Sequence, residues 1–160
     1  MKQAFTVRPA QESDLDAVVA LWQDMAQQHA GYDRQRWEFA PDAPEQFRKM
    51  LLEALDHKDR MVLVAVGDDG PPMGFLLGRI NEQAPILAPT RLGMVQWLGV
   101  SPHCRSAGLG RRLVLAAMDE FRRRGVTAMN LLVANENTRA IQFYEKLGMR
   151  SLIREMYMRL

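Results

Sequence analysis

The stretch from Met94 to Arg112 constrains the fold of this chain more than any other. Met94 to Val100 is an apolar run of strand length, and a loop that contains Gly108 and Gly110 follows it. Apolar residues then recur four positions apart, as on one face of a helix: Leu109, Leu113, Ala117 and Phe121. The stretch therefore predicts a strand, a tight glycine loop and a helix in direct succession.

The start of this predicted helix has the properties of an anion site. The first N–H groups of a helix have no partner within it, and the helix dipole places about half a positive charge there, so phosphate binds readily. Glycines let a ligand approach the backbone without a Cβ in the way. Ser101 to Gly125 carries six Arg against two acids, a net +4 in a chain of net charge +2. The alternative is a plain tight turn that binds no ligand.

Two common nucleotide-binding motifs do not match this loop. The P-loop needs a Lys directly after its last glycine, but Arg111 follows Gly110. The dinucleotide fingerprint needs a third glycine at position 113, which is Leu113. A phosphate ligand at this loop therefore belongs to a different kind of site.

The loop and a later block together resemble a known family. Arg105-Ser106-Ala107-Gly108-Leu109-Gly110 resembles the Arg/Gln-x-x-Gly-x-Gly/Ala signature of the GNAT superfamily, the acetyl-CoA-dependent N-acetyltransferases. Leu98 to Pro102 is similar to the strand ending that precedes that signature. The block from Asn137 through Phe143 and Tyr144 to Met149 matches as well, in the right order and at the right separation. The resemblance covers nearly the whole chain.

The resemblance implies an α/β (α+β) fold in one domain over residues 1–160. Its sheet is GNAT-like, mixed, mostly antiparallel and twisted, with six to seven strands flanked by about four helices. A glycine inside a strand, here Gly99, predicts a bulge or a close backbone approach, and in the family such a bulge splays two neighbouring strands apart. The residue patterns themselves predict strands at 4–8, 61–67, 73–80, 94–100 and 127–134, one or two more in 149–160, and helices at 13–28, 45–57, 109–124 and 138–147.

The resemblance also implies acetyl-CoA as the cofactor, CoA as the product and no metal. It places the pantetheine arm against the backbone of Leu98, Gly99 and Val100. The diphosphate would lie at the loop residues Arg105, Ser106, Ala107, Gly108, Leu109, Gly110 and Arg111. The residue pattern alone makes Asn137 a plausible helix N-cap. In the family the equivalent residue also contacts the pantetheine arm, and the resemblance places Tyr144 next to that arm.

Acetyl transfer to an amine sets three chemical requirements. The amine must be neutral to attack, and for a pKa near 10.4 this costs about 4–5 kcal/mol at pH 7. The tetrahedral oxyanion needs donors such as backbone N–H groups. The leaving thiolate needs a proton, and a phenol suits this because its pKa of about 10 lies above that of a thiol near 8.5. The resemblance gives this acid role to Tyr144, whereas its periodicity alone favours an aromatic packed in the core.

The general base is where this sequence departs from the family. Many relatives carry a Glu on the central strand or the strand before it, but Gly93 to Leu98 contains no carboxylate. We therefore expect a water-mediated base that uses Gln96 and backbone carbonyls, helped by Glu82 upstream. His103 is expected at the surface on the phosphate side of the loop. No His–Asp or Cys–His arrangement supports Cys104 as a nucleophile.

Composition sets the remaining expectations. The chain has 160 residues, 48% of them hydrophobic and 25% charged, as in an ordinary globular domain. A single Cys excludes an internal disulfide and agrees with a reducing compartment. No signal-peptide core and no apolar run of about 18 residues is present, so we expect a cytoplasmic protein without a membrane partner. The mild net charge argues against a nucleic-acid surface.

The acceptor is expected to be a small-molecule or peptide amine, and a homodimer is common in the family. The acids Asp24, Asp33, Glu38 and Asp42 form either an acidic lip that attracts a cationic amine or an ordinary solvated surface. Two other functions stay open. One is a non-catalytic acyl-CoA-binding or regulatory module on the same fold. The other is an interaction protein in which the glycine loop is only a turn.

Overall fold

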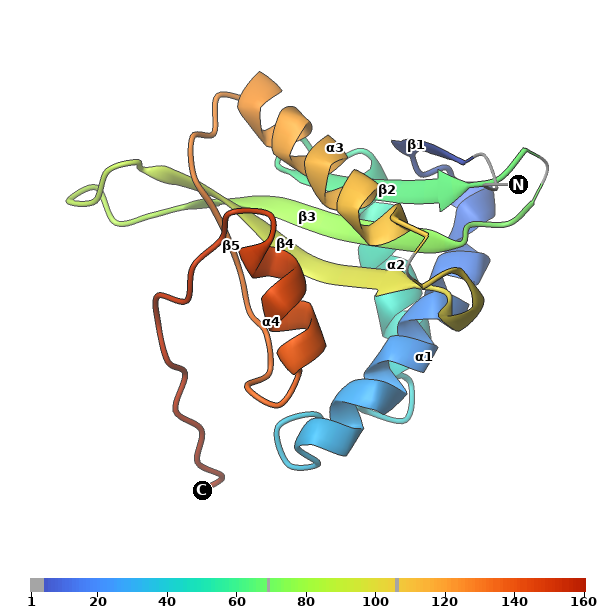
Figure 1. The fold of residues 1–160 in the computed structure, drawn as a ribbon, viewed down its shortest axis with the longest axis horizontal. Coiled ribbons are helices and arrows are strands. Elements are labelled where there is room, and N and C mark those ends of the chain that lie inside the picture. The colour runs from blue at the N-terminus through green and yellow to red at the C-terminus, as the bar shows by residue number, and fades with distance from the viewer. Residues whose placement is uncertain (1–4, 69, 106) are drawn as a thin grey trace.

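A twisted sheet forms the centre of the molecule. The computed structural model describes residues 5–68, 70–105 and 107–160. Within them the sheet has five strands that lie side by side in chain order (Figure 1). Neighbours are antiparallel, except that the last strand is parallel to the fourth. The strands are β1 (Thr6–Pro9), β2 (Arg60–Val66), β3 (Gly74–Glu82), β4 (Arg91–Val100) and β5 (Met129–Leu131).

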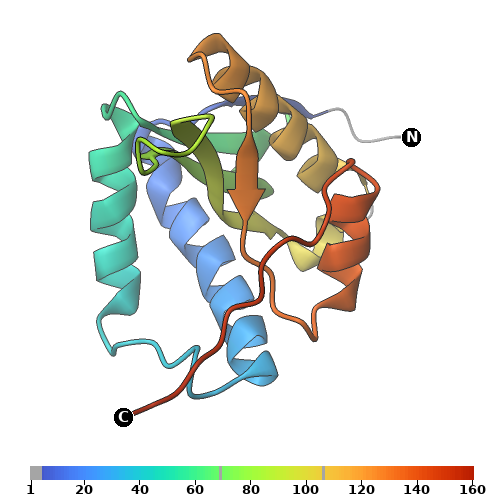
Figure 2. The same cartoon turned by 90° about the vertical axis from the view of Figure 1, so that its left-hand side faces the viewer.

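Helices cover both faces of this sheet (Figure 2). One face carries α1 (Leu15–Tyr32) and α2 (Ala43–Leu55), and the other carries α3 (Leu109–Arg123) and α4 (Thr138–Glu145). Successive side chains of a strand point to opposite faces, so Val62, Val64 and Val66 join the core under α1 and α2. Met61, Leu63 and Ala65 join the core under α3. The apolar face predicted for the helix from Leu109 is buried along its whole length.

The prediction of six to seven strands is wrong for the described residues, because residues 149–160 form no strand. This segment runs instead toward the connection between α1 and α2, where Arg159 pairs with Glu38 and Tyr157 donates to the Gln35 carbonyl oxygen. Six of its large hydrophobic side chains are exposed: Leu152, Ile153, Met156, Tyr157, Met158 and Leu160. The strand predicted at 127–134 is shorter in the structure than predicted, because β5 covers only three residues.

The bulge in β4 lies three residues earlier than predicted. Leu77 of β3 is opposite Trp97, and Gly78 is opposite Val95, so Gln96 is the extra residue. Gly99 lies in regular pairing with Phe75. A Cβ at Gly99 would lie 2.4 Å from Cε1 of Phe75. The glycine is therefore required by the ring of Phe75 that packs on it, and not by a bulge.

The start of α1 is fixed by an ion pair between Arg8 and Asp14. Asp14 is buried, and its two carboxylate oxygens accept hydrogen bonds from Arg8 at 2.7 and 2.9 Å. The backbone N–H of Gln11 donates to the same carboxylate at 2.7 Å. These donors lower the pKa of Asp14 below its usual range, with the hydrogen bond from Arg8 as the main cause. The pair ties β1 to the first turn of α1.

Candidate active site

A cavity of about 920 Å³ opens where β4 and β5 part, and residues of α1, α3 and α4 also line it. The two strands pair from Gly93 opposite Met129 to Val95 opposite Leu131. Beyond Leu131, β4 continues to Val100, but no described strand pairs with its edge on this side. The separation that the resemblance predicted is therefore present, and Leu98, Gly99 and Val100 lie on the cavity wall.

The N-terminus of α3 opens onto the same cavity. Gly108 has φ +87°, a conformation that favours glycine, and no atom of the described residues lies within 4 Å of where its Cβ would be. No described side chain caps this helix. Among the described residues, the N–H groups of Leu109, Gly110 and Arg111 have no acceptor outside the helix. These N–H groups, together with the helix dipole, form a site suited to an anion.

The arginines around this helix start differ in their roles. Arg105 and Arg111 are exposed and line the cavity, and Nη2 of Arg105 lies 3.4 Å from Oε1 of Gln28 on α1. Arg112 turns away, donating to the Phe5 carbonyl oxygen at 2.9 Å and lying over the Phe5 ring. Arg105 and Arg111 therefore add positive charge where the N–H groups of α3 are open.

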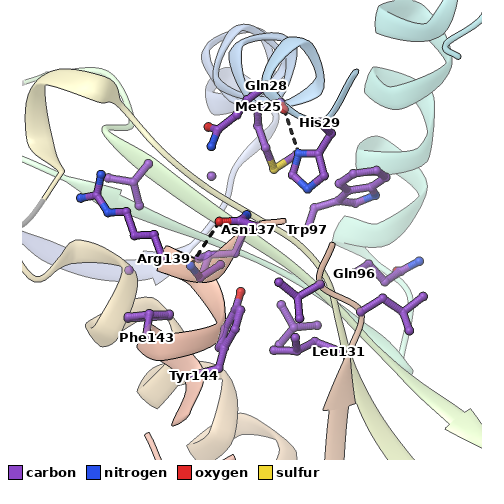
Figure 3. Close-up of a pocket in the computed structure, with 18 of the residues that line it drawn as sticks. Met25, Gln28, His29, Gln96, Trp97, Leu131, Asn137, Arg139, Phe143 and Tyr144 are labelled. Carbon is purple, nitrogen blue, oxygen red and sulfur yellow. Dashed lines mark hydrogen bonds between the residues drawn. The ribbon is translucent and has the colours of Figure 1, made fainter. Parts of the chain in front are cut away.

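Asn137 and Tyr144 lie on the opposite wall, on α4. The side chain of Asn137 accepts a hydrogen bond from the Ala140 N–H at 3.2 Å, so the predicted N-cap is confirmed. The hydroxyl of Tyr144 points into the cavity (Figure 3). Burial raises the pKa of Tyr144 to about 12. The phenol thus keeps its proton throughout the range in which an enzyme works.

An aromatic wall that the sequence did not predict faces Tyr144. His29 of α1 packs edge-on against Trp37, with ring centroids 4.7 Å apart, and Trp37 lies 6.2 Å from Trp97 of β4. The signal for this wall was present in α1 as a second stripe at helical spacing. Leu21, Met25, Gln28 and His29 line the cavity, whereas the stripe of Leu15, Val18, Trp22 and Ala26 faces the core.

The predicted acids divide into two groups. Asp24 and Glu38 line the cavity. Asp33 and Asp42 instead accept hydrogen bonds from residues close to them in the chain. Asp33 accepts from the backbone N–H groups of Gln35 and Arg36, and Asp42 accepts from the side chain of Gln46. The acidic lip is therefore smaller than the sequence suggested.

The structure brings most of the predicted site residues to this one cavity. Ala107 does not line it, and Ser106 lies outside the described residues. Glu82 is 3.5 Å from Arg91 and does not line the cavity, so the structure gives it no place beside Gln96. His103 is exposed in the short turn Pro102–Cys104 and does not line the cavity either. The lining includes Gln96, Leu98, Gly99, Val100, Arg105, Gly108, Leu109, Gly110, Arg111, Asn137 and Tyr144.

Across residues 5–68, 70–105 and 107–160, no cluster of three or more His, Cys, Asp or Glu side chains is arranged to hold a metal ion. In the same part of the chain, no helix combines the length and apolarity needed to span a membrane.

The sequence matches the family model described as Acetyltransferase (GNAT) family over residues 20–149. The chain therefore belongs to the GNAT acetyltransferase family. The matched region contains the glycine loop, both strands that border the cavity and α4, so the family assignment and the geometry of the cavity concern the same residues.

Similar sequences include mycothiol acetyltransferases of Thermobispora bispora and Paenarthrobacter aurescens. That of Thermobispora bispora is 39% identical over 79 residues, which cover 49% of this chain and 26% of the relative. That of Paenarthrobacter aurescens is 32% identical over 130 residues, which cover 74% of this chain and 39% of the relative. The chain thus matches only about a quarter to two fifths of the length of these relatives.

Solved structures show the same fold over nearly the whole chain. A tetramutant of the BH1408 protein from Bacillus halodurans aligns with a TM-score of 0.82 at 24% identity, covering 97% of this chain and 99% of that one. Aminoglycoside N-acetyltransferase AAC(6')-Iy, solved with CoA, aligns with a TM-score of 0.75 at 18% identity, covering 98% and 95%. At these identities the likeness establishes the fold alone.

Proposed function

We propose that this chain is an N-acetyltransferase that moves an acetyl group from acetyl-CoA directly to a primary amine of a small molecule. The observation that carries the proposal is that one cavity joins three features: the open N-terminus of α3, the unpaired edge of β4 and the phenol of Tyr144. Each feature meets one requirement of acetyl transfer. We further propose that residues 1–160 act as one domain.

The chain's residues fit the parts of acetyl-CoA in order. The N–H groups of Leu109, Gly110 and Arg111 would bind the diphosphate, assisted by Arg105. The free edge of β4 from Leu98 to Val100 offers backbone hydrogen-bonding groups to the amides of the pantetheine arm. When bound, acetyl-CoA supplies the activated thioester. These residues hold that thioester at the end of the cavity where Tyr144 lies.

Tyr144 would act as the general acid. Its proton passes to the sulfur as the carbon–sulfur bond breaks, and such acid catalysis is worth about 10²–10⁴ in rate. Backbone N–H groups of β4 near the Gln96 bulge are the nearest candidates to stabilise the oxyanion. Gln96 itself cannot take a proton, so in this proposal it orders a water molecule.

The acceptor side of the cavity favours a small cationic amine. Asp24 and Glu38 provide negative charge, and Trp37 and Trp97 provide aromatic surface that suits an ammonium group. Relatives named for mycothiol and neighbours named for aminoglycosides support a small-molecule acceptor. The expected absence of a metal, of a nucleic-acid partner and of a membrane partner stays a prediction, as do the cytoplasmic location and the homodimer.

Two measurements test this proposal. CoA at about 100 times its dissociation constant should stabilise the protein by about 2.7 kcal/mol, which raises the melting temperature by about 5–11 °C for a chain of this size. Free thiol release should then be followed with acetyl-CoA and a panel of glucosamine, kanamycin and spermidine. Absence of a CoA-induced shift contradicts the proposed CoA site.

A single variant distinguishes the proposed enzyme from a non-catalytic module that only binds acyl-CoA. Tyr144→Phe should retain the CoA-induced shift but lose about 10²–10⁴ in kcat. A wild-type protein that binds CoA yet acetylates none of the panel would favour the binding module. Undiminished turnover by Tyr144→Phe would remove Tyr144 as the acid.

A further inference from the structure

The side chain of His29 reaches the cavity from the wall opposite Tyr144. His29 lies in the last turn of α1, and its ring points toward the side where the Tyr144 hydroxyl also points (Figure 3). The catalytic residues predicted from the sequence do not include His29, because it lies more than 60 positions before the blocks that match the family.

A single hydrogen bond determines which ring nitrogen of His29 is free. Nδ1 lies 2.9 Å from the carbonyl oxygen of Met25. A carbonyl oxygen can only accept, so Nδ1 carries the hydrogen and donates it. The lone pair of the neutral ring is then on Nε2. Among the described residues Nε2 has no hydrogen-bond partner, so it is available to a ligand in the cavity.

Aromatic neighbours hold this ring in place. Trp37 packs edge-on at 4.7 Å and Tyr32 at 5.7 Å between ring centroids. With the bond to Met25, these contacts fix the direction of Nε2 before a substrate enters. A positioned proton acceptor needs such support.

The other proton acceptors around the cavity are less suitable. Glu38 is engaged by Arg159, and Asp24 is exposed at the outer end of the wall. The stretch Gly93 to Leu98 of β4 carries no carboxylate, and the amide of Gln96 does not accept a proton. Among the lining residues, His29 alone combines a free basic nitrogen with a fixed orientation.

We propose that Nε2 of His29 is the general base that removes a proton from the acceptor ammonium, a role that rests on the proposed acetyl transfer. The ammonium loses one proton to Nε2, which passes it to solvent. The amine lone pair then forms a bond to the thioester carbon, and the carbon–sulfur bond breaks as Tyr144 protonates the sulfur. The second proton of the attacking nitrogen returns to the Tyr144 oxygen, which leaves amide, free thiol and one released proton.

His29→Asn is the sharpest variant, because the Asn side-chain NH₂ lies near the position of Nδ1 and can still donate to Met25. It removes the proton-accepting nitrogen and the ring contacts with Trp37 and Tyr32, but keeps the hydrogen bond to Met25. With the alkylamine of the panel that the wild type acetylates fastest, kcat should fall about 10²–10⁴-fold while KM changes little. His57→Asn is the matched control, because His57 is exposed and does not line the cavity, and its kcat should stay within about threefold.

Two further measurements separate a base from a structural residue. Hydrazine is a much weaker base than an alkylamine, so a far larger fraction of it is already neutral at the assay pH, and the defect of His29→Asn should shrink at least tenfold with this nucleophile. Added imidazole should restore part of the kcat of His29→Ala, because it supplies the missing base in the vacated space. Retained CoA-induced thermal shifts in both variants would show that the fold is intact.

The possible failures are distinguishable. If the wild type binds CoA but acetylates no amine, the proposed function fails and this inference fails with it. If the wild type is active and His29→Asn keeps its kcat within threefold, only the role of His29 is overturned. The same conclusion holds if hydrazine is impaired as strongly as the alkylamine, or if imidazole restores nothing.

Discussion

Substituting Gly99 by Ala tests whether β4 is shaped by the ring of Phe75. The added Cβ would lie 2.4 Å from Cε1, 3.1 Å from Cδ1 and 3.3 Å from Cζ of that ring. Carbon atoms in contact prefer about 3.5–4.0 Å, so the ring or the strand must move by about 1 Å. Phe75 is fully buried and packs on Phe47, with ring centroids 6.1 Å apart, so it has no free space to enter.

The expected loss of stability is large for one methyl group. Overpacking of a core typically costs about 1–3 kcal/mol, and three ring atoms inside contact distance place Gly99→Ala at about 3 kcal/mol. The lower chain entropy of Ala in the unfolded state offsets about 0.4–1 kcal/mol of this. Since about 1 kcal/mol corresponds to 2–4 °C in a chain of this size, the melting temperature should fall by about 4–10 °C.

Calorimetry or urea unfolding measures this change, and Gly31→Ala is the matched control. A Cβ at Gly31, in the last turn of α1, would have nothing within 4 Å. That substitution should be neutral or stabilise by up to about 1 kcal/mol, because Ala has the higher helix propensity. In Gly99→Ala/Phe75→Leu the two effects should be less than additive, as expected for residues in contact. A melting temperature of Gly99→Ala within about 1 °C of the wild type would refute the steric argument.

Three further predictions concern local features of the fold. Asn137→Ala removes the N-cap of α4 and should destabilise by about 1 kcal/mol, which thermal unfolding measures; an unchanged melting temperature would contradict the cap. The pKa of Asp14 is lowered in the folded state, so its contribution is full above the unfolded pKa of about 3.9 and is lost as pH falls through the folded value. Asp14→Asn should therefore show a flatter loss of stability below about pH 4 than the wild type, and parallel curves would argue against the Arg8–Asp14 pair. For Tyr144, burial raises the pKa to about 12, so stability is full below the unfolded pKa of about 10 and falls as the pH rises toward the folded value. An ultraviolet difference titration of wild type against Tyr144→Phe should place this ionisation above about pH 11, and a midpoint near 10 would show an exposed phenol.

The predictable parts of this protein are those that depend on neighbouring residues in the chain. The glycine loop, the apolar face of α3 and the cap by Asn137 each follow from side chains within a few positions of one another. Their positions in the structure agree with the sequence pattern. Most residues of the proposed cofactor site belong to these local features, and they line one cavity in the structure.

The features that the sequence did not predict depend on distant partners. The bulge at Gln96 is a property of the register between β3 and β4, and a glycine at position 99 gives no information about that register. The course of residues 149–160 depends on contacts with the α1–α2 connection, such as the pair of Arg36 and Glu155. His29 packs on Trp37, which in turn packs on Trp97 of β4, and helical spacing alone cannot show these contacts.

The shortness of β5 has a direct consequence for the site. If β5 continued to pair beyond Leu131, its backbone would satisfy the free edge of β4 from Leu98 to Val100 and would close the cavity. Because pairing stops at Val95, next to the bulge, that edge keeps backbone donors and acceptors with no partner strand among the described residues. Such groups favour a ligand that carries its own amides. The same break in pairing that leaves the sheet incomplete therefore creates the binding surface.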